Sequence, residues 1–250
     1  MVALNDRLAA QTFGTHEQVV LFVHGGARPE LTWSRQAPLA DRWRLVIPWR
    51  RCFDPSPPGP RQDWEVDARD LREILPQGAH VVAHSYGGVG AAVAVAREPH
   101  GVSSLTLIEP PLWFVAEHDP EVARLVRIAR TAGDPNADPE LRKRFLQLAG
   151  LPELHPDTAQ LERLARDLRD PAEARPDLDA IRTAGMPTAI VSGGHSVGLE
   201  RLCDALGEGL GAARVVLPGA GHAVQRTPEF NGWLASFLEK ATPAASPFRD

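Results

Sequence analysis

The sequence has very little cysteine. Only Cys52 and Cys203 occur in 250 residues, far apart and outside any Cys-x-x-Cys pattern. Neither a disulfide framework nor a cysteine metal cage is indicated, because both need several cysteines at set spacings. The scarcity is typical of a protein of the reducing cytoplasm, and a cytoplasmic location is expected.

Lysine is almost as scarce, and no block of basic residues occurs. Lys143 and Lys240 are the two lysines among 27 basic residues, and the net charge is −5. The sequence therefore lacks the electrostatic footprint of a partner for nucleic acid or anionic membranes. No basic stretch near the N-terminus leads into an apolar run, so no secretory signal is expected. Residues 79–96 carry no Asp, Glu, Lys or Arg, but their histidines and glycines argue against a membrane span.

Motifs that cradle nucleotide phosphates are absent as well. Neither GxxxxGK[ST] nor GxGxxG occurs in the sequence. We therefore expect no cofactor, and a small-molecule substrate as the partner. The remaining composition is ordinary, with 43% apolar and 24% charged residues, and is typical of a globular protein with one large domain.

Short apolar runs alternate with helical patterns along the chain. Such runs, each ending at a turn, have the length and residue types of buried strands. The six runs are residues 19–23, 45–47, 80–83, 105–108, 188–192 and 214–217, and the helical patterns are 64–75, 86–97, 199–210 and 228–238. The alternation predicts an α/β fold with a mostly parallel, doubly wound sheet covered on both faces. The helix at 86–97 is apolar all round and is predicted to be central.

One long interval interrupts this alternation. Residues 110–186 contain no strand-like run and have amphipathic helical stripes instead. Asp119 and Asp138 each precede a Pro-Glu pair, which is typical of a capped helix start. We predict a core domain formed by residues 1–109 and 187–250, with a helical cap at 110–186 inserted into it.

The strongest local motif is a serine between a predicted strand and a predicted helix. Ser85 is flanked two positions away by Ala83 and Gly87. A sharp strand-to-helix turn crowds both positions, so both must be small, and the serine hydroxyl then projects above the strand ends. This pattern predicts a nucleophile elbow; the alternative is a small-residue junction with an incidental serine.

A second motif is the glycine-rich loop after the first apolar run. His24 is followed by Gly25 and Gly26, and such a loop can turn a backbone N–H toward the serine. The residue after the nucleophile commonly supplies the other donor. We predict an oxyanion hole from the amides of Gly26 and Tyr86. His24 itself is interpreted as a structural hydrogen-bonding residue.

The third motif is a histidine in the glycine-rich loop after the last predicted strand. His222 lies in Gly219-Ala220-Gly221-His222. A serine hydroxyl becomes a good nucleophile when an imidazole accepts its proton, and the imidazole needs a carboxylate to fix its tautomer. His222 is therefore the predicted general base.

These motifs, in this order and with a helical cap, resemble the α/β-hydrolase fold family, in particular its serine esterases. The resemblance covers nearly the whole chain. It implies an eight-stranded sheet, a cap inserted after the family's sixth strand and a Ser-acid-His triad. Because 18 residues precede the first strong strand, we expect a sheet shortened at the N-terminus.

The acid departs from the family pattern. The loop after the strand that follows the cap has Ser196 where an acid is usual. Some relatives take the acid one strand earlier, where Glu109 closes an apolar strand. A carboxylate there is costly unless it is paired. We therefore predict the triad Ser85, Glu109 and His222, with Glu200 or Asp204 as alternative acids.

These residues predict a cofactor-independent hydrolase that cleaves an ester, thioester or lactone with a hydrophobic portion through an acyl-enzyme. Trp33 and Trp113 are predicted to contact the substrate. Two alternatives stay open: carbon–carbon bond hydrolysis or a lyase or cyclase step on the same triad, and a ligand receptor without turnover. No metal site is expected, because His80 and His84 share a strand face without a third ligand.

Overall fold

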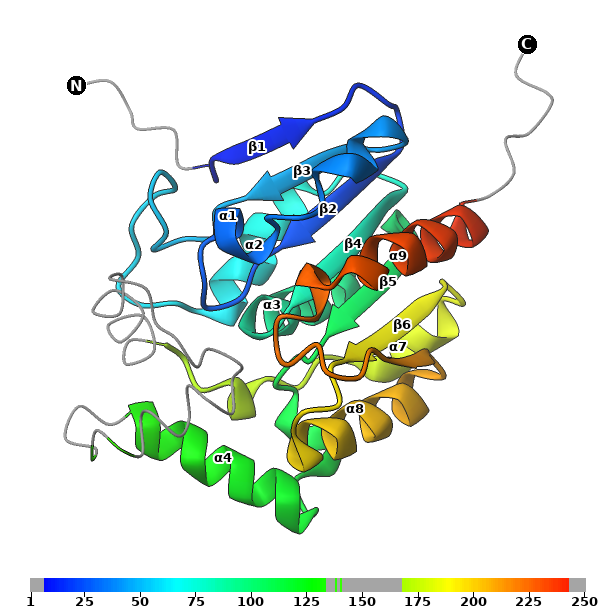
Figure 1. Ribbon diagram of the computed structural model, residues 1–250. Coiled ribbons are helices and arrows are strands. Elements are labelled where there is room, and N and C mark those ends of the chain that lie inside the picture. Colours follow the sequence, from blue (N-terminus) through cyan, green and yellow to red (C-terminus); the bar gives the residue numbers. More distant parts are fainter. Residues whose placement is uncertain (1–6, 134–137, 139, 141–167, 243–250) are drawn as a thin grey trace.

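A computed structural model describes residues 7–133, 138, 140 and 168–242 (Figure 1). One seven-stranded sheet runs through these residues in the order β1-β3-β2-β4-β5-β6-β7. Only β1 is antiparallel to its neighbour, β3. The strands are β1 (Ala10–Phe13), β2 (Val19–Val23), β3 (Arg44–Pro48), β4 (Ala79–His84), β5 (Val102–Ile108), β6 (Thr188–Ser192) and β7 (Ala213–Val216). The mostly parallel sheet confirms the predicted fold class.

The two edges of the sheet differ from the sequence prediction. Strand β1 was not predicted, because its four residues are largely exposed and form no apolar run. Strand β7 was predicted to be buried, and this is wrong. Among the described residues it is the last strand of the sheet and pairs with β6 alone, and it leaves Val216 42% exposed.

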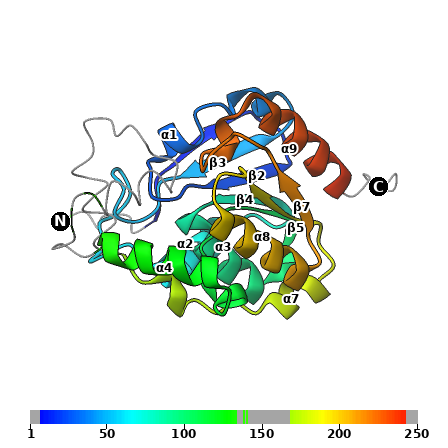
Figure 2. The same ribbon diagram turned by 60° about the horizontal axis from the view of Figure 1, so that its bottom comes forward.

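Helices cover both faces of the sheet (Figure 2). One face carries α2, α3, α7 and α8, and the other carries α1 and α9. On β2, Leu21 and Val23 pack into the first layer, while Val20 and Phe22 pack into the second. The helices are α1 (Pro29–Thr32), α2 (Trp64–Ile74), α3 (Tyr86–Arg97), α4 (Pro120–Gly133), α7 (Leu178–Thr183), α8 (Val197–Leu210) and α9 (Pro228–Ala241). Alternate side chains of one strand thus enter opposite cores.

Helix α3 lies in the centre of the first layer, as its apolar sequence predicted. Its first ten residues are all buried. It approaches α2 so closely that a Cβ on Gly90 would lie 2.8 Å from the Cβ of Asp67. The small residues of α3 therefore let the helix that begins after Ser85 pack tightly in the core.

Part of the predicted cap lies within the described residues. Asp119 caps α4, accepting the N–H groups of Glu121 and Val122 over 2.9 and 3.2 Å. Helix α4 packs on α8 through an apolar cluster, whereas α7 packs against α3 and α8 of the core. Much of the rest of the interval in which helical stripes were predicted falls outside the described residues, so the boundaries 110–186 stay a prediction.

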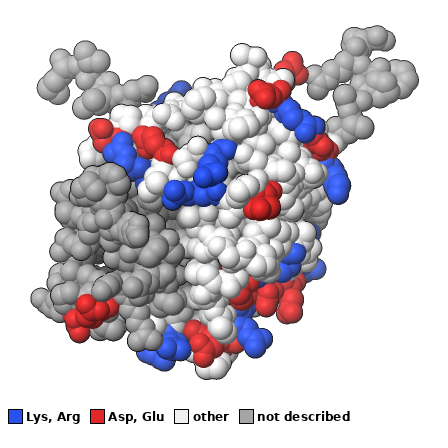
Figure 3. Space-filling view, in the orientation of Figure 1, with Lys and Arg blue, Asp and Glu red and all other residues white. Residues whose placement is uncertain are grey.

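The surface carries charges of both signs. On the face shown in Figure 3, acidic and basic side chains of the described residues are interspersed around a mostly uncharged area. No helix in this part of the chain has the length and apolar character to cross a bilayer.

Candidate active site

Ser85 lies at the turn between β4 and α3, as the motif predicted. Its φ is +52°, a region that non-glycine residues rarely adopt and that is frequent at functional sites. Its N–H donates to the carbonyl of Ile108 on β5 over 2.8 Å. The turn leaves no room beside it: a Cβ on Gly87 would lie 2.1 Å from the His24 carbonyl oxygen. The crowding explains why the sequence has glycine at this position.

His222 joins Ser85 to Glu109. Its Nε2 lies 2.9 Å from Ser85 Oγ, and its Nδ1 lies 2.5 Å from Glu109 Oε2. His222 is in the loop after β7, and Glu109 directly follows β5. The three residues, of which Ser85 and His222 were predicted from motifs and Glu109 from the resemblance, thus form a continuous hydrogen-bonded line. This is the geometry of a serine–histidine–carboxylate triad.

Glu109 is only 1% exposed, and hydrogen bonds hold it from several sides. Its Oε1 accepts the N–H of Gly193 over 2.8 Å, and its own N–H donates to the Val191 carbonyl over 3.0 Å. Its φ of +44° is, like that of Ser85, unusual for a residue with a side chain. The buried carboxylate therefore has the partners that its position at the end of an apolar strand requires.

The alternative acids are engaged elsewhere. Glu200 accepts from Ser192 Oγ over 2.7 Å and forms an ion pair with Arg214 over 2.5 Å. Asp204 pairs with the same arginine over 2.8 Å. These contacts tie α8 to β7. Of the three candidate acids, Glu109 is the one that the structure brings to His222.

The loop after β6, where the resemblance implies an acid, makes other contacts. Ser196 caps α8 by accepting the N–H of Leu199, and His195 Nδ1 lies 3.4 Å from Glu109 Oε1. Within the described residues, Glu109, His195 and His222 form a group whose ligand atoms all lie within 4.8 Å and could hold a metal ion. Two of these three side chains, Glu109 and His222, are already hydrogen-bonded to each other.

The glycine loop lies against the serine. An ideal Cβ on Gly25 would be 2.8 Å from Ser85 Cβ, whereas Gly26 is exposed and has open space around its Cα. His24 is fully buried, and its Nδ1 contacts the Ala27 carbonyl over 2.8 Å. Burial, together with the charge of Arg50, holds the pKa of His24 well below its usual value. His24 is thus a neutral, structural residue, in agreement with its sequence interpretation.

Tyr86, the first residue of α3, carries the second predicted donor. Its side chain is buried, and its hydroxyl donates to the Arg169 carbonyl over 2.9 Å. Burial raises the pKa of this phenol, so the side chain stays protonated.

The two tryptophans predicted to contact substrate are both buried. Trp33 packs 4.9 Å from the ring of Phe22 and 6.5 Å from that of His84. Trp113 lies in an apolar cluster with residues of α4 and α8. Their predicted role in substrate binding stays a prediction.

His84 is a residue of this site that sequence reasoning missed. Its ring lies 4.6 Å from the ring of His222, and burial together with the neighbouring His222 lowers its pKa to about 3. In the sequence, His84 was weighed only as a metal ligand. Its position directly before Ser85 was the signal that could have placed it in this site.

A parallel sheet with this elbow and this hydrogen-bonded line defines the class of α/β enzymes built around a serine, a histidine and a carboxylate. The sequence profile of the alpha/beta hydrolase family matches residues 20–230. The chain belongs to this family.

Solved structures resemble the whole chain at low sequence identity. A thermophilic esterase from Thermogutta terrifontis is 21% identical, with a TM-score of 0.71 and 94% of each chain covered. The N-acyl homoserine lactonase AidH is 20% identical, with a TM-score of 0.70 and 96% of each chain covered. A carboxylesterase structure from the thaumarchaeon Nitrososphaera gargenis is 18% identical, with a TM-score of 0.67, and covers 94% of this chain and 95% of its own. A search of curated protein sequences gives no significant match.

Proposed function

We propose that the protein is a cofactor-independent serine hydrolase that cleaves an ester, thioester or lactone through an acyl-enzyme. One observation carries the proposal: His222 lies 2.9 Å from Ser85 Oγ on one side and 2.5 Å from Glu109 Oε2 on the other. A general base within hydrogen-bonding reach of the nucleophile, itself oriented by a buried carboxylate, is the arrangement that activates a serine.

The reaction begins with attack of Ser85 Oγ on the substrate carbonyl carbon. His222 Nε2 takes the hydroxyl proton, and Glu109 holds the Nδ1–H and stabilises the imidazolium. The carbonyl oxygen becomes an oxyanion that accepts from the amides of Gly26 and Tyr86. Collapse of the tetrahedral adduct breaks the bond to the alcohol or thiol, which receives the proton from His222.

Hydrolysis of the acyl-enzyme repeats these steps with water. His222 removes a proton from the water as its oxygen attacks the acyl carbon, and the proton then passes to Ser85 Oγ as the ester bond breaks. The carboxylic acid leaves, and the free serine returns. No electron transfer or cofactor enters this balance.

A hydrophobic portion in the substrate belongs to the same proposal. It is supported by Trp33, whose ring centroid lies 6.5 Å from that of His84, the residue before Ser85. The solved relatives named above include two esterases and a lactonase, which supports a carboxylic ester or lactone as the substrate class. A cytoplasmic location and a small-molecule partner belong to the same proposal.

Labelling with a small fluorophosphonate tests the proposal without knowledge of the substrate. We expect one covalent adduct in the intact mass of the wild type and none in Ser85→Ala. Ser236→Ala, an exposed serine on α9, is the matched control and should label like the wild type. Failure of the folded wild type to label would contradict the proposal and favour a receptor; labelling without ester or lactone turnover would favour the carbon–carbon hydrolase or lyase alternative.

A further inference from the structure

Arg50 is a buried charge that the proposed mechanism does not use. It follows β3, is fully buried, and pairs with Asp67, which is 2% exposed, over 2.6 Å. A buried ion pair of this kind contributes little net stability compared with well-packed apolar residues. Net stability alone therefore does not explain why an arginine occupies this buried position.

The guanidinium of Arg50 binds the glycine loop beside Ser85. Its Nε donates to the His24 carbonyl over 2.9 Å, and one Nη donates to the Gly25 carbonyl over 2.8 Å. Its backbone N–H donates to His24 Nε2 over 2.9 Å. Because Nε2 accepts, the proton of neutral His24 is on Nδ1, which lies 2.8 Å from the Ala27 carbonyl and 3.1 Å from that of Gly25.

This carbonyl belongs to the peptide whose N–H is the proposed oxyanion donor. In a planar trans peptide the C=O of Gly25 and the N–H of Gly26 point in opposite directions. Fixing the carbonyl on Arg50 therefore fixes the direction of the Gly26 N–H. The positive charge of Arg50 next to this carbonyl also polarises the peptide bond, which makes the Gly26 N–H a stronger donor.

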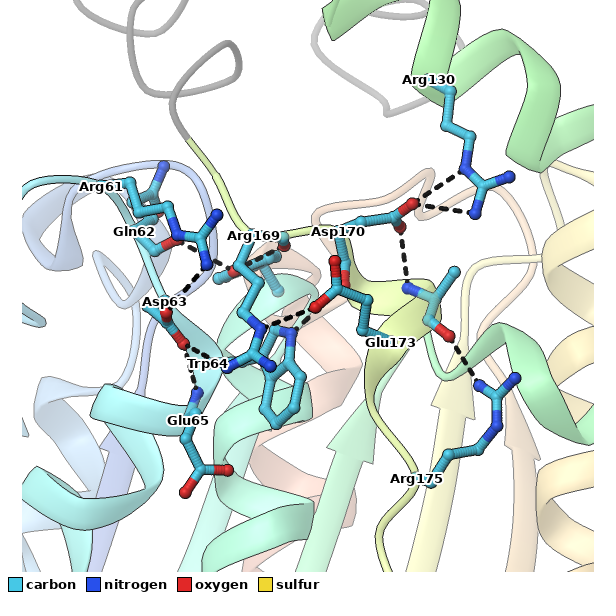
Figure 4. A network of polar contacts seen from close by, with 12 residues as sticks. Arg61, Gln62, Asp63, Trp64, Glu65, Arg130, Arg169, Asp170, Glu173 and Arg175 are labelled. Carbon is cyan, nitrogen blue, oxygen red and sulfur yellow. Dashed lines mark hydrogen bonds and ion pairs between the residues drawn. The ribbon is translucent and has the colours of Figure 1, made fainter.

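A second set of contacts links Arg50, through Gln62, to Arg169 in the interval of the predicted cap. Gln62 Oε1 accepts from Arg50 over 2.6 Å, and the Gln62 carbonyl accepts the N–H of Arg169 over 2.8 Å. Figure 4 shows this junction, where the guanidinium of Arg169 lies 4.2 Å from the ring of Trp64 and pairs with Asp63. The hydroxyl of Tyr86 reaches the same two carbonyls, those of Gln62 and Arg169.

We infer that Arg50 is a positioning residue of the oxyanion hole: it orients and polarises the peptide between Gly25 and Gly26. Gln62 holds Arg50 in place and connects this peptide to Arg169. The inference rests on the proposed function, because it assigns a purpose to the Gly26 amide. Lysine could not replace Arg50, since one ammonium cannot serve four acceptors in a plane.

Steady-state kinetics on a p-nitrophenyl ester test the inference, with Arg51 as the matched control. Arg51 is the next residue and forms a two-point ion pair with Asp70 over 2.6 and 3.0 Å. For Arg50→Lys we expect kcat to fall about 100-fold, the scale of a lost oxyanion donor, with KM changed less than about threefold. Arg51→Lys should keep kcat, and equal losses in both variants would overturn the inference.

A milder variant covers the case in which Arg50→Lys does not fold. Gln62→Met removes one acceptor of Arg50 and leaves the main-chain contacts of residue 62. We expect a fall in kcat of about tenfold, the scale of one hydrogen bond, and weaker inhibition by a trifluoromethyl ketone, whose adduct places an oxyanion in the hole. Full kcat and unchanged inhibition in Gln62→Met would contradict the inference.

A crystal structure of Arg50→Lys, or of Gln62→Met if Arg50→Lys does not fold, separates the positioning role of Arg50 from the proposed hydrolase function. A rotated peptide between residues 25 and 26 supports the positioning role. It does so even if the wild type is not labelled by fluorophosphonate, because the lack of labelling would refute only the proposed function. An unmoved peptide overturns the positioning role even if the wild type is an active hydrolase.

Discussion

His84 donates a hydrogen bond from its Nε2–H to the backbone carbonyl of His222 across 2.9 Å. The donor must be the imidazole, because a carbonyl oxygen can only accept. The residue directly before Ser85 thereby holds the loop that carries the proposed general base. With a pKa lowered to about 3, His84 stays neutral over the pH range in which the proposed triad would work.

Removal of this donor should impair catalysis without removing a triad residue. In His84→Phe the His222 carbonyl loses its partner, and we expect kcat/KM to fall about tenfold, in line with the net value of one hydrogen bond. In His84→Gln the amide nitrogen can replace Nε2, and most of the activity should return. Equal losses in the two variants, measured on the same ester, would show that the ring packing matters and the hydrogen bond does not.

The acid can be tested against its nearest competitor. Glu109→Gln should slow acylation by roughly 10⁴-fold, because the amide favours the wrong tautomer of His222. Glu200→Gln changes a carboxylate that is engaged by Arg214, and its acylation rate should stay within tenfold of the wild type. Stopped-flow kinetics with an activated ester measure both rates, and the reverse order of effects would move the acid to Glu200.

Acid pH should destabilise the protein through His80. Its Nδ1 contacts Ser104 Oγ over 2.7 Å, and burial lowers its pKa to about 4. The unfolded chain, with a histidine pKa near 6.5, binds the proton more readily. The contribution of His80 is therefore fully present above pH 6.5 and is lost as the pH falls toward 4, by up to about 1.4 kcal/mol per pH unit.

Denaturant unfolding between pH 4 and 7 checks this expectation. His80→Gln should have a shallower dependence of the unfolding free energy on pH than the wild type. His118, which has a side chain 96% exposed, provides the control: His118→Gln should keep the wild-type slope. An unchanged slope in His80→Gln would mean that this imidazole is protonated equally in both states.

Two glycine-to-alanine changes should have opposite effects. In Gly87→Ala the new Cβ would lie 2.1 Å from a backbone oxygen of His24, so the elbow must shift and both fluorophosphonate labelling and the melting temperature should fall. Gly232, on α9, has nothing within 4 Å of an added Cβ. Gly232→Ala should stabilise the protein by about 1 kcal/mol through helix propensity. A tolerated Gly87→Ala would show that the elbow is looser than its contacts indicate.

The fold followed from the sequence where one strand or helix carried its own signal. Buried strands such as β2 (Val19–Val23) are continuous apolar runs because helices cover both faces. The edge strand β1 has no such run, because its residues are largely exposed. It is a strand through its pairing with β3, which the local sequence does not reveal. Local patterns therefore predict the centre of the sheet better than its edges.

The three residues of the proposed triad could be selected from the sequence because each directly follows a predicted strand or lies in the loop after one. Glu109 was selected because Ser196 stands where the resemblance implies an acid, and Glu109 closes the strand before. Arg50 was missed, because a charged residue in a loop is normally solvated. Only the tertiary structure shows that its guanidinium meets the carbonyls of His24 and Gly25.

The attachment of the proposed triad residues to the sheet has a consequence for their dynamics. Ser85 and Glu109 follow adjacent strands, β4 and β5, and the Ser85 N–H is bonded to the residue before Glu109. These two groups cannot separate unless the sheet itself opens, which costs a large part of the global unfolding free energy. His222 instead lies in a loop after the edge strand β7. Microsecond-to-millisecond exchange in the proposed triad should therefore be confined to residues 217–223, and this loop would set the rate at which His222 comes within hydrogen-bonding reach of Ser85 and Glu109.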